Sequence, residues 1–153
     1  PLVNPPMPGN QLLGVYNLKL LRLYRYIAQN EGINCTIVHS LDGYDEISLT
    51  SPFKVVDNSR ELILSASDLG LETVTPQDLY GGDTEESASR IFDDVLEGRA
   101  SRAKKDCVIA NAAFAISTLE RDLDIAQAIA QARESLESGA ALEAFRKFLD
   151  INS

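Results

Sequence analysis

Three carboxylates fall within five positions of one short stretch, and their type suits them to binding a metal cation. Asp42, Asp45 and Glu46 follow an apolar run at 36–38 that is typical of a short buried strand. Gly43 marks a turn among them. Neighbouring carboxylates repel each other, so Asp45 and Glu46, the acidic pair, indicate either a divalent cation that neutralises both or a solvated hydrophilic turn. The spacing leaves both alternatives open, and the plain turn is the commoner one.

Magnesium is the cation that such a pair would suit. It prefers one or two protein carboxylates and completes its coordination with water and substrate phosphates. In open α/β sheets, ligands bind beyond the carboxyl ends of strands, where this stretch is expected to lie. The cation alternative therefore predicts a metal–diphosphate site formed by Asp45 and Glu46.

Other residues that could take part in catalysis or binding have simpler structural interpretations. His39, the only histidine, could act as a base near its ordinary pKa of about 6.5, but no nucleophile accompanies it, and we expect it to end a strand. The Gly-Gly-Asp at 81–83 could cradle a phosphate, yet a turn before a helix cap explains it better. Cys35 and Cys107 stand in apolar surroundings without CxxC spacing, which indicates buried, reduced thiols of a cytosolic protein. The basic residues between 99 and 105 indicate a solvated helix-start loop.

Composition bounds the class of protein. The chain has 153 residues, 44% of them hydrophobic and 24% charged, which is enough for one α/β domain. A net charge of -9 argues against general binding to nucleic acid, and requires that a phosphorylated substrate meet a metal ion or local basic groups. No apolar run approaches the roughly 20 residues that span a membrane, and no signal peptide is present, so we expect a cytoplasmic location. Because the chain begins with Pro1 rather than Met, we expect an internal fragment.

The first half of the chain predicts strands around one helix. Residues 11–16 and 35–38 are expected to be strands, joined by a helix at 18–30 with Asn17 as its N-cap and Gly32 after its end. This is a βαβ unit, which implies parallel strands. Two further strands, at 53–56 and 61–64, form an expected hairpin around the turn at 57–59.

Beyond residue 64 the pattern indicates helices. The expected helices start at Thr75, run from about 84 to 96, from about 105 to 119, from 123 to 136 with Asp122 as cap, and from 140 to 149. The helix at 105–119 is apolar all round and should be the most buried. We therefore predict one α/β domain over residues 1–153, with a mixed, partly parallel sheet, flanking helices and an all-helical C-terminal half.

Several stretches, taken in order, resemble the anthranilate phosphoribosyltransferase family. They are Pro-Leu-Val-Asn-Pro at 1–5, the strand at 11–16, Val-His at 38–39, Asp-Gly-Tyr-Asp-Glu-Ile-Ser at 42–48, Gly-Gly-Asp at 81–83, Asn-Ala-Ala at 111–113 and Ser-Gly-Ala-Ala-Leu at 138–142. The resemblance covers nearly the whole chain. It implies the C-terminal part of a nucleoside phosphorylase/phosphoribosyltransferase-like α/β domain. The family's Gly-rich diphosphate loop, its Lys-His-Gly-Asn stretch and its dimerising helical domain would lie upstream of Pro1.

The resemblance also implies a reaction. The family transfers the phosphoribosyl group of phosphoribosyl diphosphate to the amine of anthranilate in tryptophan biosynthesis, with Mg²⁺ as cofactor. Asp45 and Glu46 match its metal-binding acids, and Pro1 matches the proline of a turn that lines the anthranilate pocket. The parent protein would be a homodimeric glycosyltransferase that acts on small molecules, without nucleic acid or membrane as partner. Residues 1–153 alone, lacking the phosphate cradle, are expected to be inactive.

Two alternatives remain open. A pyrimidine nucleoside phosphorylase-like enzyme would use phosphate as nucleophile and no Mg²⁺ pair, so Asp45 beside Glu46 argues against it. A non-catalytic, nucleic-acid-binding paralogue of the fold would be of a different class, and the charge of -9 argues against that one.

Overall fold

Four strands form one mixed sheet in the computed structural model, which describes residues 8–152. They are β1 (Asn10–Gly14), β2 (Asn34–Ser40), β3 (Phe53–Val56) and β4 (Glu61–Leu64), neighbours in that order. β1 and β2 run parallel and are joined by α1 (Leu18–Glu31), whereas β2, β3 and β4 pair antiparallel. The predicted βαβ unit, hairpin and partly parallel sheet are confirmed.

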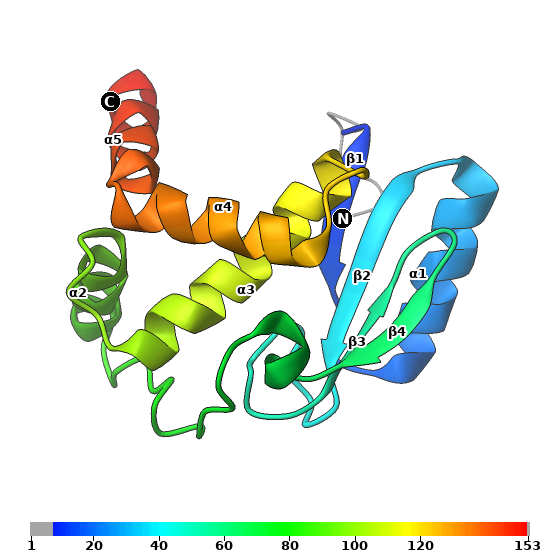
Figure 1. The fold of residues 1–153 in the computed structure, drawn as a ribbon, viewed down its shortest axis with the longest axis horizontal. Coiled ribbons are helices and arrows are strands. Elements are labelled where there is room, and N and C mark those ends of the chain that lie inside the picture. The colour runs from blue at the N-terminus through cyan, green and yellow to red at the C-terminus, as the bar shows by residue number, and fades with distance from the viewer. Residues whose placement is uncertain (1–7, 153) are drawn as a thin grey trace.

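Helices make up most of the remaining chain. A short 3-10 helix, η1 (Ala66–Leu69), precedes α2 (Glu85–Leu96), α3 (Arg102–Leu119), α4 (Ile125–Glu137) and α5 (Ala140–Asn152). Figure 1 shows α1 on one side of the sheet and α3 and α4 on the other, with α2 and α5 farther out. Among the described residues, no helix combines the length and apolarity that crossing a bilayer requires. The expected helical C-terminal half is confirmed.

Local capping signals explain where α1 begins and ends. The Asn17 side chain accepts a hydrogen bond from the Leu20 N–H at 2.9 Å, as expected of an N-cap. Gly32 follows the helix with φ of 65°, a left-handed conformation that glycine adopts without steric cost. Both predictions are confirmed.

Two predicted helix starts are wrong. Thr75 does bond Asp78 through its N–H and hydroxyl at 2.8 and 2.7 Å, but residues 76–79 form only a turn. Gly82 follows closely with φ of 88°, which a right-handed helix excludes, so no helix extends from the capping contacts. In α4 the cap is Asp124 rather than Asp122, because Gln127 stands three residues later and completes a reciprocal capping box.

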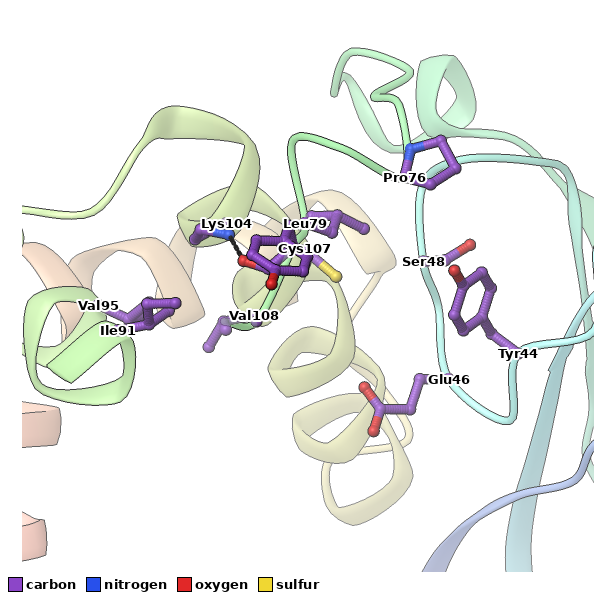
Figure 2. Close-up of a pocket in the computed structure, with 12 residues that line it drawn as sticks. Tyr44, Glu46, Ser48, Pro76, Leu79, Ile91, Val95, Lys104, Cys107 and Val108 are labelled. Carbon is purple, nitrogen blue, oxygen red and sulfur yellow. Dashed lines mark hydrogen bonds between the residues drawn. The ribbon is translucent and has the colours of Figure 1, made fainter. Parts of the chain in front are cut away.

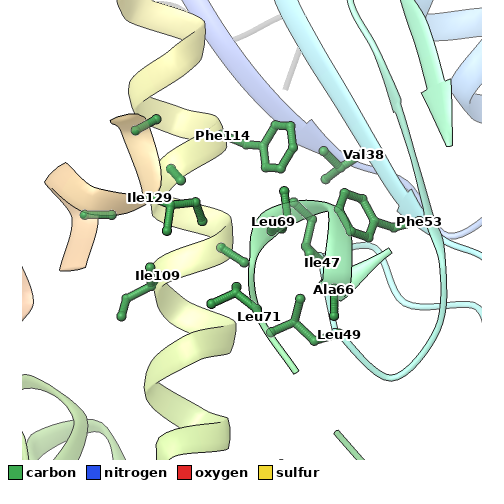
Figure 3. Close-up of a cluster of buried hydrophobic side chains, with 14 of the residues drawn as sticks. Val38, Ile47, Leu49, Phe53, Ala66, Leu69, Leu71, Ile109, Phe114 and Ile129 are labelled. Carbon is green, nitrogen blue, oxygen red and sulfur yellow. The ribbon is translucent and has the colours of Figure 1, made fainter. Parts of the chain in front are cut away.

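The core divides between the two faces of the sheet. Side chains alternate along β2, so that Cys35 and Ile37 pack toward α1 while Val38 packs toward α3. Figure 3 shows the larger cluster, in which Phe114 of α3 meets Phe53 of β3 edge to face with ring centroids 5.8 Å apart. Six residues of α3 are buried, more than in any other helix, which confirms its expected burial.

Candidate functional site

The acidic pair lies in the loop between β2 and β3, residues 41–52, which we call the acidic loop. The loop begins where β2 ends, and it packs on the adjoining end of β1. A β-carbon added to Gly14, the last residue of β1, would lie 1.6 Å from the Asp45 carbonyl oxygen. Glycine at position 14 therefore lets the loop sit directly over the carboxyl ends of the two parallel strands.

Ser40, the last residue of β2, holds the acidic loop from within. Its N–H donates to the Tyr44 carbonyl at 2.9 Å, and its hydroxyl donates to the Glu46 carbonyl at 2.6 Å. The Ser48 N–H in turn donates to the Ser40 hydroxyl at 3.2 Å. Ser40 is fully buried, so water has little access to its own N–H and hydroxyl groups.

Asn111 of α3 holds the same loop from outside. Its side-chain oxygen accepts a hydrogen bond from the Ile47 N–H at 3.0 Å. Its side-chain NH₂ donates to the carbonyls of Ile47 and Cys107, each at 2.9 Å. Sequence reasoning gave no role to this residue, although it begins the Asn-Ala-Ala stretch at 111–113 that contributes to the family resemblance.

The carboxylates of the acidic pair are exposed and free of protein partners. Within residues 8–152, neither Asp45 nor Glu46 makes a side-chain hydrogen bond or ion pair. No cluster of three or more His, Cys, Asp or Glu side chains suited to a metal occurs in that range. Two available carboxylates without further protein ligands fit Mg²⁺, which fills its other positions with water and phosphate oxygens, and do not fit an all-protein metal cage. The metal role itself stays a prediction.

A cavity of about 480 Å³ opens beside the acidic loop. Its wall is mostly apolar, and Glu46 and Lys104 supply opposite charges to it. Figure 2 shows Glu46 leaving the acidic loop toward α3, which contributes Lys104 and Cys107. Asp45 is not part of the lining. The lining residues are Tyr44, Glu46, Ser48, Pro76, Leu79, Tyr80, Gly81, Ile91, Val95, Lys104, Cys107 and Val108.

The basic residues between 99 and 105 are less uniform than expected. Arg99 is exposed and pairs with Asp94 at 2.8 Å, as a solvated loop residue would. Lys104 instead is half-buried, lines the cavity and donates to the Tyr80 carbonyl, as the dashed line in Figure 2 marks. The solvated interpretation is therefore wrong for Lys104, because the segment that follows the turn at 76–79 lies against the start of α3.

Both cysteines are free, and both thiols are protonated near neutral pH. Burial raises the pKa of Cys35 to about 11. Burial, and then the charge of Glu46, raise the pKa of Cys107 to about 11 against the opposing effect of Lys104. Cys35 is buried as expected, but Cys107 is only partly buried: it lines the cavity and its thiol donates to the Ile47 carbonyl at 3.2 Å.

The remaining candidates serve the fold. His39 is buried, and its Nδ1 lies 2.8 Å from the Val15 carbonyl, to which it must donate, so it ties the end of β1 to β2. Asp42 accepts a hydrogen bond from the Thr50 hydroxyl inside the acidic loop. After the turn at 81–83, Thr84 caps α2 by accepting from the Ser87 N–H at 3.1 Å, as interpreted. Pro1 lies outside the described residues.

Comparisons with known proteins agree with this architecture. The anthranilate phosphoribosyltransferase of Phocaeicola vulgatus is 51% identical over 153 residues, which cover 100% of this chain and 46% of that protein. The enzyme of the same name from Bacteroides fragilis is 53% identical over 152 residues, 99% of this chain and 46% of that one. The chain thus spans about half the length of the curated relatives it matches.

Solved structures share the fold over nearly the whole chain. The anthranilate phosphoribosyltransferase from Thermus thermophilus superposes with a TM-score of 0.87 at 26% identity, over 98% of this chain and 45% of that chain. The Saccharomyces cerevisiae enzyme in complex with PRPP and Mg gives a TM-score of 0.82 at 26% identity, over 93% and 41%. The sequence model of the glycosyl transferase family, a/b domain, matches residues 1–142. This chain therefore belongs to the family described as glycosyl transferase family, a/b domain.

Proposed function

We propose that the chain is part of an anthranilate phosphoribosyltransferase, which transfers the phosphoribosyl group of phosphoribosyl diphosphate to the amine of anthranilate. The observation that carries the proposal is the acidic pair, Asp45 and Glu46, held over the carboxyl ends of parallel strands with both carboxylates free of protein partners. Curated relatives at 51% and 53% identity bear this enzyme's name. One solved neighbour is in complex with PRPP and Mg, and another is in complex with 4-fluoroanthranilate.

In this proposal Asp45 and Glu46 hold Mg²⁺, the cofactor of the reaction. When bound, the ion supplies charge stabilisation for the departing diphosphate. A chain with a net charge of -9 would otherwise repel that group. Hydrogen bonds from Ser40 and Asn111 hold the backbone of the acidic pair in place. Pro1, by its resemblance to the family's turn, would line the anthranilate pocket.

We further propose that residues 1–153 form one domain, the C-terminal portion of the phosphoribosyltransferase α/β domain in a longer protein. Within residues 8–152, β1 pairs only with β2, so its other edge offers backbone groups to a further strand. The relatives are about twice as long as this chain. The missing portion would carry the diphosphate cradle and the dimerising helices, and the parent would be a homodimer. Free, protonated cysteines are in keeping with a cytoplasmic enzyme of tryptophan biosynthesis.

An activity assay of the full-length protein tests the substrate assignment. We expect consumption of anthranilate that requires both phosphoribosyl diphosphate and Mg²⁺. Residues 1–153 alone are expected to give no turnover under the same conditions. A parallel assay with a pyrimidine nucleoside and inorganic phosphate, without Mg²⁺, covers the nucleoside phosphorylase alternative. Activity in that arm and none with anthranilate would overturn the proposal.

A further inference from the structure

The peptide unit that joins Glu46 to Ile47 is held at both of its polar atoms. Its carbonyl oxygen accepts from the Ser40 hydroxyl at 2.6 Å, and its N–H donates to the Asn111 side chain at 3.0 Å. These partners come from β2 and from α3, so they approach the loop from different elements. A planar peptide bound on both sides cannot rotate without breaking a hydrogen bond. The direction in which Glu46 leaves the backbone is thereby fixed.

Asn111 bonds both backbone polar groups of Ile47, as a paired residue on a neighbouring β-strand would. Its amide oxygen takes the Ile47 N–H, and its NH₂ group donates to the Ile47 carbonyl at 2.9 Å. Ile47 is 0% exposed, so water has little access to its N–H and carbonyl groups. Loss of the Asn111 side chain would leave a buried N–H without a partner, and a change of loop conformation is the way to relieve that cost.

Thr118 provides a contrast on the same helix. It stands about two turns beyond Asn111 and is buried against the sheet, where its hydroxyl donates to the Thr36 hydroxyl at 2.8 Å. Both side chains therefore join α3 to the sheet region by hydrogen bonds. Of these two residues, Asn111 alone bonds the acidic loop, so comparing their variants distinguishes general helix packing from an effect on the loop.

We propose that Asn111 is a positioning residue that aims the Glu46 carboxylate at the metal–diphosphate site. The proposal rests on the proposed function, because Glu46 acts there as a ligand of Mg²⁺. Asn111 itself touches neither metal nor substrate in this scheme. It acts through the Glu46–Ile47 peptide, as an outer-shell group that orients a carboxylate ligand. Its removal should weaken metal binding more than it weakens the fold.

Mn²⁺ binding in the full-length protein tests this role without relying on turnover. Free Mn²⁺ is followed by electron paramagnetic resonance in the presence of phosphoribosyl diphosphate. We expect Asn111→Ala to weaken Mn²⁺ binding by about 10- to 100-fold, the usual effect of removing an outer-shell partner. The matched control Thr118→Val should change it by less than about twofold, because the site and Thr118 share no partner. Urea unfolding compares the stability of the two variants.

Hydrogen exchange at the Ile47 amide reports directly on its hydrogen bond to Asn111. Asn111→Ala should speed exchange there, and Thr118→Val should not. Faster exchange combined with wild-type Mn²⁺ affinity overturns the positioning role, as does an equal loss of affinity in Thr118→Val. If Asn111→Ala does not fold, the isosteric Asn111→Asp replaces it, because it retains an acceptor for the Ile47 N–H and loses both donors. Asn111→Asp should weaken Mn²⁺ binding by about twofold to tenfold. Unchanged Mn²⁺ affinity in Asn111→Asp counts equally against the positioning role.

Failure of the proposed function gives a different result. In that case wild-type protein and Glu46→Gln bind Mn²⁺ equally weakly with phosphoribosyl diphosphate present. The metal assignment then falls, and the positioning role falls with it. Strong wild-type binding that Glu46→Gln removes and Asn111→Ala leaves intact overturns the positioning role alone.

Discussion

The carbonyl oxygen of Asp45 lies directly against Gly14, and a β-carbon added to Gly14 would be 1.6 Å from that oxygen. A contact that close with backbone cannot be absorbed by a side-chain movement. Gly14→Ala should therefore displace the acidic loop and cost about 1–3 kcal/mol of unfolding free energy, as overpacking does. It should also lower Mg²⁺-dependent turnover of the full-length protein.

Gly9→Ala is the matched control for that substitution. A β-carbon at Gly9 meets nothing within 4 Å, and the residue is exposed. Urea unfolding and turnover of the two variants are compared with wild type. Wild-type stability and turnover in Gly14→Ala would show that the loop does not rest on β1 as described.

The pKa of the Cys107 thiol should respond to the charge on Glu46. Burial and then the Glu46 carboxylate raise the pKa of this thiol to about 11. Glu46→Gln removes a negative charge, so the thiol pKa should fall and alkylation by iodoacetamide at a fixed mildly alkaline pH should accelerate. The pH profile of the alkylation rate gives the measurement.

Two features of the chain serve as controls in the alkylation experiment. Cys35 is 1% exposed, so it should stay unreactive while the protein is folded. Glu31→Gln makes the same charge change at the exposed end of α1, on the opposite side of the sheet (Figure 1), and should leave the profile unchanged. Identical profiles for Glu46→Gln and wild type would place the Glu46 carboxylate away from the thiol.

The alkaline loss of stability should depend in part on Cys35. Burial raises its pKa from 9.0 to about 11, so the folded state favours the protonated thiol. That stabilisation is complete below the unfolded pKa and is lost as pH rises through the folded value, at up to about 1.4 kcal/mol per pH unit between the two. Urea unfolding at about pH 8 and about pH 10.5 should show a smaller alkaline loss for Cys35→Ala than for wild type. Equal losses would contradict the assignment, since the two proteins differ only at residue 35.

Asp106 makes the most buried ion pairs among the described residues. Its side chain is 3% exposed and accepts from Arg133 at 3.0 Å and Arg102 at 3.3 Å. Asp106→Asn should cost about 1.5–3 kcal/mol, as expected for hydrogen bonds to charged groups. Arg102→Gln should cost less than about 1 kcal/mol, because that side chain is 69% exposed and the pair is screened by water. Equal costs in urea unfolding would show that the burial of Asp106 does not strengthen its pairs.

Local signals in the sequence were enough to predict most of the fold. Asn17 and Gly32 bracket α1 through contacts within a few residues, and the hairpin of β3 and β4 turns at Asp57, whose carboxylate accepts from the Ser59 N–H at 2.7 Å. The false helix start at Thr75 shows the limit of such signals. Its cap forms, but a cap cannot extend a helix through glycine at φ of 88°.

The candidate site was predictable only in part. Asp45 and Glu46 stood out because their types and adjacency are visible in the sequence itself. The Asn111 contact joins residues 64 positions apart, and no local pattern encodes such a pairing. The cavity likewise is lined by residues from the acidic loop, from residues 76–81, from α2 and from α3, which lie far apart in the sequence. Chemistry carried by neighbours in sequence could be anticipated, whereas support contributed across the fold could not.

We propose that the acidic pair holds the Mg²⁺ used in phosphoribosyl transfer. The most direct test of this proposal is the Mg²⁺ dependence of anthranilate turnover in the full-length protein carrying Asp45→Asn with Glu46→Gln. The control carries Glu85→Gln with Glu86→Gln, an equal charge change in another adjacent and exposed acidic pair. We predict loss of Mg²⁺-dependent turnover in the first protein and wild-type behaviour in the second. Wild-type turnover with an unchanged Mg²⁺ requirement in the Asp45 and Glu46 variant would show that the acidic pair does not hold the ion.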